Sequence, residues 1–112
     1  MTDEQRKYLM DIRSSIEAIS FHLGGKRDYF QYLGNLTVKR AVEREIEIIG
    51  EATSRLLKLD DSIAISNARK IVDLRNKVIH AYDAVNDAVV WKIVVVDIPK
   101  LSEEVGLLLN QS

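Results

Sequence analysis

The chain of 112 residues contains no cysteine, a single proline and only 6% aromatic residues. Without cysteine it forms neither disulfides nor thiolate metal sites, which fits a reducing cytoplasm. Its longest apolar run, residues 88–96, is interrupted by Lys92 and is too short to cross a bilayer. The first residues are charged and do not resemble a signal peptide. We therefore expect a cytoplasmic protein that does not associate with membranes.

The chain also lacks an excess of charge of either sign. Sixteen Lys and Arg residues balance seventeen Asp and Glu residues, for a net charge of −1. The protein as a whole is thus not attracted to nucleic acid, and any RNA site has to come from local clustering. A hydrophobic content of 46% is ordinary for a globular protein. The length suits one core, so we expect a single domain over residues 1–112.

The first half of the sequence predicts two helices. Thr2 and Gln5 have the spacing of a capping box, and Gly24-Gly25 is a typical helix end. Between them one apolar stripe recurs at helical spacing, at Leu9, Ile12, Ile16, Ile19 and Leu23. His22 lies beside that end, where a cationic imidazole favours the terminal carbonyls, so a structural role explains it. In the connector over residues 26–36 we expect the aromatic residues Tyr29, Phe30 and Tyr32 to pack on the bundle.

A second helix is expected over residues 37–59. Its heptad-like apolar seam consists of Val38, Ala41, Val42, Ile49, Ala52, Leu56 and Leu59. Glu45 falls within this seam, so it either has a partner or a wet cleft, or a slight rotation brings it to the surface. Gly50 in mid-helix costs about 1 kcal/mol relative to alanine, which a close helix crossing would explain. We interpret the outer charges as solvated, with spacing that permits i,i+4 pairs, namely Arg40, Arg44, Glu47, Glu51 and Arg55.

The second half predicts two more helical segments. Ser66 is a candidate N-cap for a helix over residues 67–81. This helix has an apolar face, expected to be the core stripe of Ile71, Leu74, Val78 and Ala81, beside a semi-apolar and a polar face. The many β-branched residues within the segment 85–98 favour a strand by propensity, but the Asn86-Asp87 cap and the length of the apolar run favour a helix. Pro99 is expected to end or kink it, before a stripe of Leu101, Val105 and Leu108. The fold class is therefore all-α, an antiparallel bundle of four to five helices.

The segment from Arg75 to Tyr82 carries the candidate chemistry. His80 can exchange a proton near neutral pH, and the Arg75 guanidinium suits a phosphate. Together they are the minimum for metal-free RNA cleavage, in which a ribose 2′-OH attacks the adjacent phosphorus. DNA lacks this hydroxyl and would not be cut. No phosphate-binding loop, hydrolase triad or metal-ligand spacing competes with this site, so no cofactor is expected.

Helix geometry adds a constraint on this pair. Residues five apart on a helix lie about 140° apart, so Arg75 and His80 do not share a face. Asn76 and His80 do share one, as do Arg75 and Tyr82. Either the helix loosens before His80, or a second copy supplies the complementary group in a two-fold homodimer. We expect Arg69, Lys70 and Lys77 to make the shared cleft basic and to bind RNA.

The motif Arg75-Asn76-x-x-x-His80-x-Tyr82 resembles that of HEPN-domain proteins of the HepT toxin type. Residues 41–52 (AVEREIEIIGEA) resemble the second-helix signature of this family, and residues 85–101 resemble the segment after its motif. The resemblance implies a helical bundle that dimerises and acts as a metal-independent endoribonuclease. In this resemblance Arg75 and His80 are the catalytic pair and Asn76 the polar helper.

The same resemblance implies a toxin–antitoxin pair. The partner is a minimal nucleotidyltransferase antitoxin, which neutralises the toxin by transferring AMP to the residue that Tyr82 matches. Such an adduct adds a negative phosphate on the face of Arg75, as charge-adding switches do. The alternative from another class is a non-catalytic helical module that binds the nucleotidyltransferase or a nucleotide. The intact Arg75 and His80 favour the nuclease.

Overall fold

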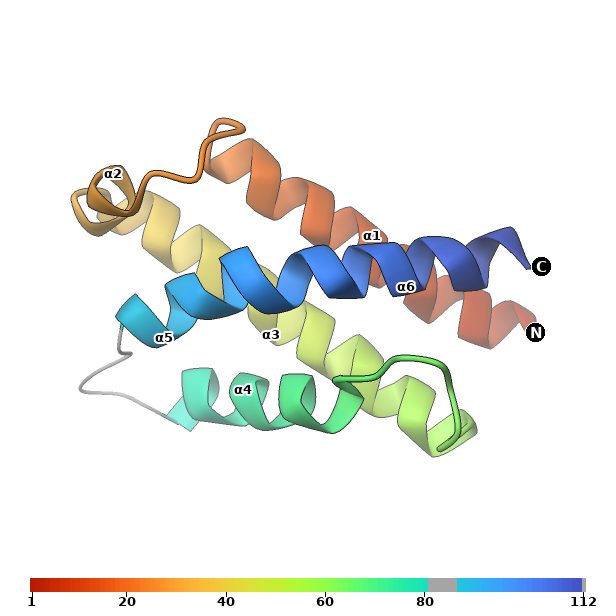
Figure 1. The fold of residues 1–112 in the computed structure, drawn as a ribbon. Helices are drawn as coiled ribbons and strands as arrows, with labels where there is room; N and C mark the ends of the chain where they lie inside the picture. The colour runs from red at the N-terminus through yellow and green to blue at the C-terminus, as the bar shows by residue number, and fades with distance from the viewer. Residues whose placement is uncertain (81–86, 112) are drawn as a thin grey trace.

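The computed structural model describes residues 1–80 and 87–111, and for residues 77–80 it describes the backbone alone. Every element in these ranges is a helix, which confirms the all-α prediction (Figure 1). The elements are α1 (Asp3–His22), α2 (Tyr29–Leu33), α3 (Leu36–Leu59), α4 (Ala68–His80), α5 (Asp87–Lys92), the π-helix η1 (Ile93–Asp97) and α6 (Ile98–Asn110). Across these residues no helix has the combination of length and apolar character that a membrane span requires.

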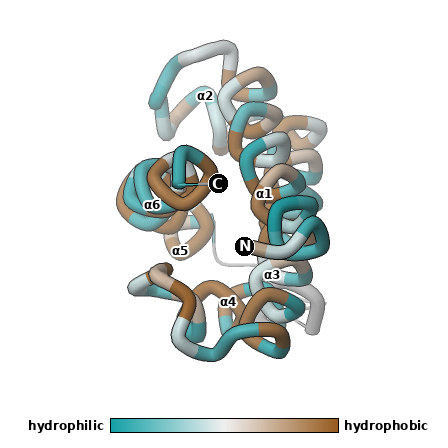
Figure 2. Tube along the Cα trace, turned by 90° about the vertical axis from the view of Figure 1, so that its right-hand side faces the viewer, coloured by the Kyte–Doolittle hydropathy of each residue, from teal (hydrophilic) through white to brown (hydrophobic). Residues whose placement is uncertain are grey.

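The longest helix, α3, lies at the centre of the bundle. It packs against α1 on one side and against α4 on the other, while α6 packs on α1 (Figure 1). Seen from the side in Figure 2, α1 and α3 face the C-terminal helices, with α4 below. The start of α1 and the end of α6 lie close together (Figure 1), where the Arg6 guanidinium donates to the Leu109 carbonyl oxygen at 3.5 Å. Helix α3 therefore connects the bundle core to α4, the helix that carries the candidate motif.

The predicted boundaries of α1 are confirmed. The Thr2 hydroxyl accepts from the Gln5 N–H at 3.1 Å, and the Gln5 side chain accepts from the Thr2 N–H at 2.9 Å. At the other end Gly24 and Gly25 have φ values of 66° and 74°, the left-handed conformation that glycine tolerates. Leu9, Ile12 and Ile19 are fully buried, and Ile16 and Leu23 pack on their edge.

Helix α3 corrects the predicted seam. It begins at Leu36, one residue early, because the Asn35 side chain caps the Val38 N–H at 3.0 Å. The inclusion of Leu59 was wrong, since 45% of it is exposed, whereas Ile46 is buried. A straight α-helix drifts by about 20° per heptad from a 3.5-residue repeat, which moves the stripe off Leu59. Glu45 is half-buried.

A second carboxylate on α3, Glu43, is more deeply buried than Glu45. It is 7% exposed and accepts from Arg40 at 3.2 Å. The connector before α3 forms the short helix α2. Its Tyr32 and Tyr29 pack on Trp91, with ring centroids 5.2 and 5.6 Å apart, as expected of connector aromatics. Phe30 was wrongly included, because 83% of it is exposed.

The segment over residues 87–98 is helical, so the strand alternative is rejected. Pro99 does not end the helix, which continues to Asn110. The π turn of η1 precedes it, with the Ile98 N–H donating to the Ile93 carbonyl five residues earlier. This shift of the backbone hydrogen bonds accommodates a residue that has no N–H and clashes with the carbonyl four residues back. Leu101, Val105 and Leu108 are buried, as predicted.

The start of α4 differs from the prediction by one residue. The Ser66 N–H and hydroxyl donate to Glu104 at 2.9 and 3.1 Å, so Ser66 fastens the preceding loop to α6. The helix begins at Ala68. Its predicted core residues Ile71 and Leu74 are buried. Val78 and Ala81, predicted to continue this stripe, lie outside the residues whose side chains are described.

Candidate functional site

Arg75 lies on α4 where this helix crosses α3 at Gly50. A Cβ added to Gly50 would overlap the Arg75 Cβ and lie 2.6 Å from Cγ and 3.2 Å from Cδ. The aliphatic stem of Arg75 therefore rests directly on the α3 backbone. This contact confirms the close crossing that Gly50 predicted and explains a glycine in the interior of a helix.

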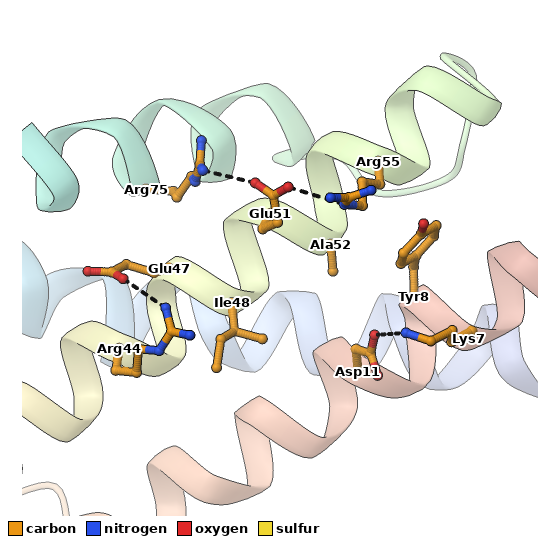
Figure 3. A pocket seen from close by; sticks show the side chains of 10 residues that line it. All are labelled: Lys7, Tyr8, Asp11, Arg44, Glu47, Ile48, Glu51, Ala52, Arg55 and Arg75. Carbon is orange, nitrogen blue, oxygen red and sulfur yellow. Dashed lines mark hydrogen bonds and ion pairs between the residues drawn. The ribbon is translucent and has the colours of Figure 1, made fainter.

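The Arg75 guanidinium is held by two neighbours, Glu51 (Figure 3) and Asn76. Its Nη2 donates to Glu51 Oε2 at 2.9 Å, and its Nη1 donates to Asn76 Oδ1 at 3.1 Å. Nε is buried, and among the described residues it has no hydrogen-bond partner. The side chain is 29% exposed. Arg75 is thus oriented by fixed contacts rather than extended into solvent.

Glu51 is shared between two arginines. Its Oε1 accepts from Arg55 Nε at 3.1 Å while Oε2 accepts from Arg75. We call Arg55, Glu51 and Arg75 the charge triad (Figure 3). The Tyr8 hydroxyl beside Arg55 raises the pKa of this guanidinium, and the Glu51 carboxylate raises it further.

The charge triad borders a cleft of about 520 Å³ between α1, α3 and α4, which we call the Arg75 cleft. Its charged lining residues are Lys7, Asp11, Arg44, Glu47, Glu51, Arg55 and Arg75. Each of the three carboxylates is paired: Asp11 with Lys7 at 2.9 Å, Glu47 with Arg44 at 3.2 Å, and Glu51 with two arginines. Four cations against three anions leave one positive charge in excess, at the charge triad.

The other motif residues are only partly described. His80 is the last residue of α4, but its side chain lies outside the described residues, as do the Lys77 side chain and the whole of Tyr82. Asn76 is exposed and contacts Arg75. Helix α4 runs without a break from Ala68 to His80. Its regular backbone leaves the two motif positions about 140° apart around the helix axis.

Two of the candidate RNA-binding cations lie away from the Arg75 cleft. Lys70 donates to the buried Asp97 at 3.0 Å, 27 residues along the chain, and so braces α4 against η1. Arg69 lines a separate hollow of about 350 Å³ with Asp73 and Lys58. The cations that do gather beside Arg75 come from α1 and α3, and none of them was among the residues predicted to bind RNA.

The residue that sequence reasoning missed is Glu51. Its predicted place on the outer face is confirmed, since 44% of its side chain is exposed and it pairs with Arg55 at i,i+4. Its ion pair with the candidate catalytic arginine was not predicted. The available signal was its position directly after Gly50, because a residue about 100° around the helix from a close crossing lies beside the partner helix, within reach of a long side chain. In the part of the chain that the structure describes, no three His, Asp or Glu side chains lie together as a metal site requires.

Comparison with known proteins adds independent evidence. A model of the family described as "Ribonuclease HepT-like" matches residues 7–108. A Methanocaldococcus jannaschii protein named as a putative RNase is 39% identical over 82 residues, which cover 71% of this chain and 74% of that protein. A Thermococcus cleftensis protein named as a probable ribonuclease HepT is 34% identical over 105 residues, covering 90% and 92%. No solved structure matches the chain.

Proposed function

The chain belongs to the Ribonuclease HepT-like family, and on this premise we propose that it is a metal-independent endoribonuclease toxin acting through Arg75 and His80. The observation that carries the proposal is the Arg75 guanidinium, held in a fixed orientation at the edge of a cleft with one excess positive charge. A fixed cation of this kind suits a phosphodiester better than a mobile lysine does.

The proposed reaction needs no group beyond histidine and arginine side chains. The His80 imidazole removes the proton from the ribose 2′-OH, and the 2′-oxygen attacks the adjacent phosphorus. The 5′-oxygen leaves with a proton from a second imidazole. General acid–base catalysis contributes roughly 10²–10⁴-fold. By analogy with a lost oxyanion-hole donor, Arg75 contributes about 10²–10³-fold by stabilising charge on the phosphoryl oxygens.

We propose that the complete site belongs to a two-fold homodimer. In one copy the helical backbone of α4 places positions 75 and 80 about 140° apart around the axis, and the unbroken helix disfavours local loosening as the remedy. A second copy closing along the Arg75 face would bring two histidines and two arginines into one cleft. One imidazole then acts as base and the other as acid.

We further propose that Tyr82 is the control point. A minimal nucleotidyltransferase antitoxin would transfer AMP to its hydroxyl, adding a phosphate that competes for Arg75. Intact-mass and peptide mass spectrometry after co-expression with such an enzyme should find the adduct on Tyr82. Absence of the adduct, with the nucleotidyltransferase active on another substrate, would refute this part of the proposal.

The nuclease assignment is tested by RNA cleavage in EDTA. Arg75→Ala and His80→Ala should each reduce the cleavage rate by at least about 10²-fold, from the magnitudes above. The chain offers matched controls: Arg13→Ala removes an exposed arginine of α1 outside the Arg75 cleft, and His22→Ala removes the other histidine. Both controls should keep wild-type activity. Undiminished cleavage by either test variant would reject the assignment, and a wild type that binds but never cuts RNA would favour the non-catalytic module.

A further inference from the structure

Two consecutive residues of α3 contact Arg75 at different points. Gly50 lies under the aliphatic stem, where no larger residue fits, and Glu51 accepts from the guanidinium at 2.9 Å. The stem and the head of Arg75 are therefore both fixed by one short stretch of the neighbouring helix. Asn76 completes the arrangement from α4 itself, at 3.1 Å.

A carboxylate so close to a phosphate-binding arginine raises an electrostatic problem. Glu51 alone would neutralise Arg75 and repel the phosphodiester that Arg75 has to attract. Arg55 offsets this effect, because it donates to the other oxygen of the same carboxylate at 3.1 Å. The charge triad keeps a net charge of +1, so Arg75 is oriented while the site stays positive.

From this geometry we infer that Glu51 is the positioning residue for Arg75, and that Arg55 preserves the attraction of the site for phosphate. The inference rests on the proposed nuclease function and assigns two residues to it. Glu51 acts through Arg75 and touches no reacting atom. Its contribution belongs to the step in which the phosphoryl oxygens gain charge, because misplacement of a stabilising group by about 1 Å can cost about 10²-fold in rate.

The two roles predict different kinetic effects. Glu51→Gln removes the charge that holds Arg75 and should lower kcat by about 10-fold or more. Because the triad then has a net charge of +2, KM should fall and not rise. Arg55→Gln leaves Glu51 with Arg75 as its only cation in the triad. This substitution should raise KM several-fold, most strongly at low ionic strength. In the double variant KM should return toward the wild-type value while kcat stays low.

One turn earlier on α3, the same cleft offers a matched control. Glu47 pairs with Arg44 at 3.2 Å, lines the Arg75 cleft and has no ion pair with Arg75. Glu47→Gln removes one negative charge from the same wall and should leave kcat within about twofold of wild type. Thermal unfolding of all variants separates lost positioning from lost folding.

A readout without RNA tests the orientation itself. In ¹⁵N-resolved spectra of the arginine side chains, Glu51→Gln should speed rotation of the Arg75 guanidinium, and Glu47→Gln should not. If the wild type cleaves RNA and both Glu51→Gln and Glu47→Gln have the same kcat as the wild type, the inference is overturned while the nuclease assignment stays intact. Higher kcat for Glu51→Gln would also overturn it, because Glu51 would then restrain Arg75. A wild type that cuts no RNA would refute the proposed function, and the inference with it.

Discussion

Replacing Gly50 with alanine tests the helix crossing on which the candidate site is built. The new methyl group would overlap the Arg75 Cβ and lie 2.6 Å from Cγ, whereas carbon atoms pack at about 3.5–4.0 Å. The obstacle is the base of a side chain, so α4 has to move by about 1 Å. Such overpacking costs about 1–3 kcal/mol. Alanine regains about 1 kcal/mol of helix propensity, so the net effect should be a loss of about 1 kcal/mol.

The chain contains a matched control for this substitution. Gly106 lies inside α6, and an added Cβ there meets nothing within 4 Å. Gly106→Ala should therefore stabilise the protein by about 0.5–1 kcal/mol, from the same helix propensity without the clash.

Urea denaturation followed by far-UV circular dichroism measures both changes in the free energy of unfolding. The two glycine-to-alanine changes should have opposite signs, and Gly50→Ala should also slow RNA cleavage by displacing Arg75. If Gly50→Ala stabilises the protein as much as Gly106→Ala does, the close approach of Arg75 to α3 is refuted.

Three further predictions concern contacts outside the Arg75 cleft. The Tyr32 hydroxyl is buried with no hydrogen-bond partner among the described residues. Urea titrations of Tyr32→Phe should therefore give a free energy of unfolding that is unchanged or raised by up to about 1 kcal/mol. Lys70→Ala removes the ion-pair partner of the Asp97 carboxylate, which is 3% exposed and keeps the Asn67 amide as a donor at 3.4 Å. Because Lys70 is 53% exposed, we expect a loss of about 1 kcal/mol, partly recovered when Asp97→Asn is added. Hydrogen bonds from the Ser62 hydroxyl and N–H lower the pKa of Asp60, so Ser62→Ala should raise that pKa in an NMR titration. Because the folded-state pKa of Asp60 is depressed, its contribution to stability is present above the unfolded-state pKa and is lost as pH falls through the folded-state pKa. Ser62→Ala should therefore lower the free energy of unfolding at neutral pH and not in strong acid.

Much of the fold could be predicted because it depends on local patterns. The capping box at Thr2, the Gly24-Gly25 end and the buried stripe of α1 are set by residues within a few turns of one another. The errors arise where a helix departs from the simplest regular pattern. Leu59 was placed in the seam because a heptad pattern ignores the drift of a straight helix. Pro99 indicated an irregularity, but it did not show that the helix continues through a π turn.

The candidate site was predictable in its residue types and not in its contacts. Arg75 and Asn76 are neighbours in sequence, and their hydrogen bond is local. The Glu51 pairing depends on where α4 crosses α3, and the Lys70 pairing depends on how η1 packs on α4. Charge periodicity along one helix cannot show either contact, because each joins side chains from separate elements.

The chemistry of the cut ends tests the assigned reaction most directly. A synthetic RNA is cleaved by purified protein in EDTA, and the ends are identified by mass spectrometry, alongside a copy with 2′-O-methyl groups at the cleavage sites. Attack by the 2′-OH through Arg75 and His80 should leave a 2′,3′-cyclic phosphate and a 5′-hydroxyl, and the methylated copy should remain intact. A 5′-phosphate with a 3′-hydroxyl, or cleavage of the methylated RNA, would contradict the proposed mechanism.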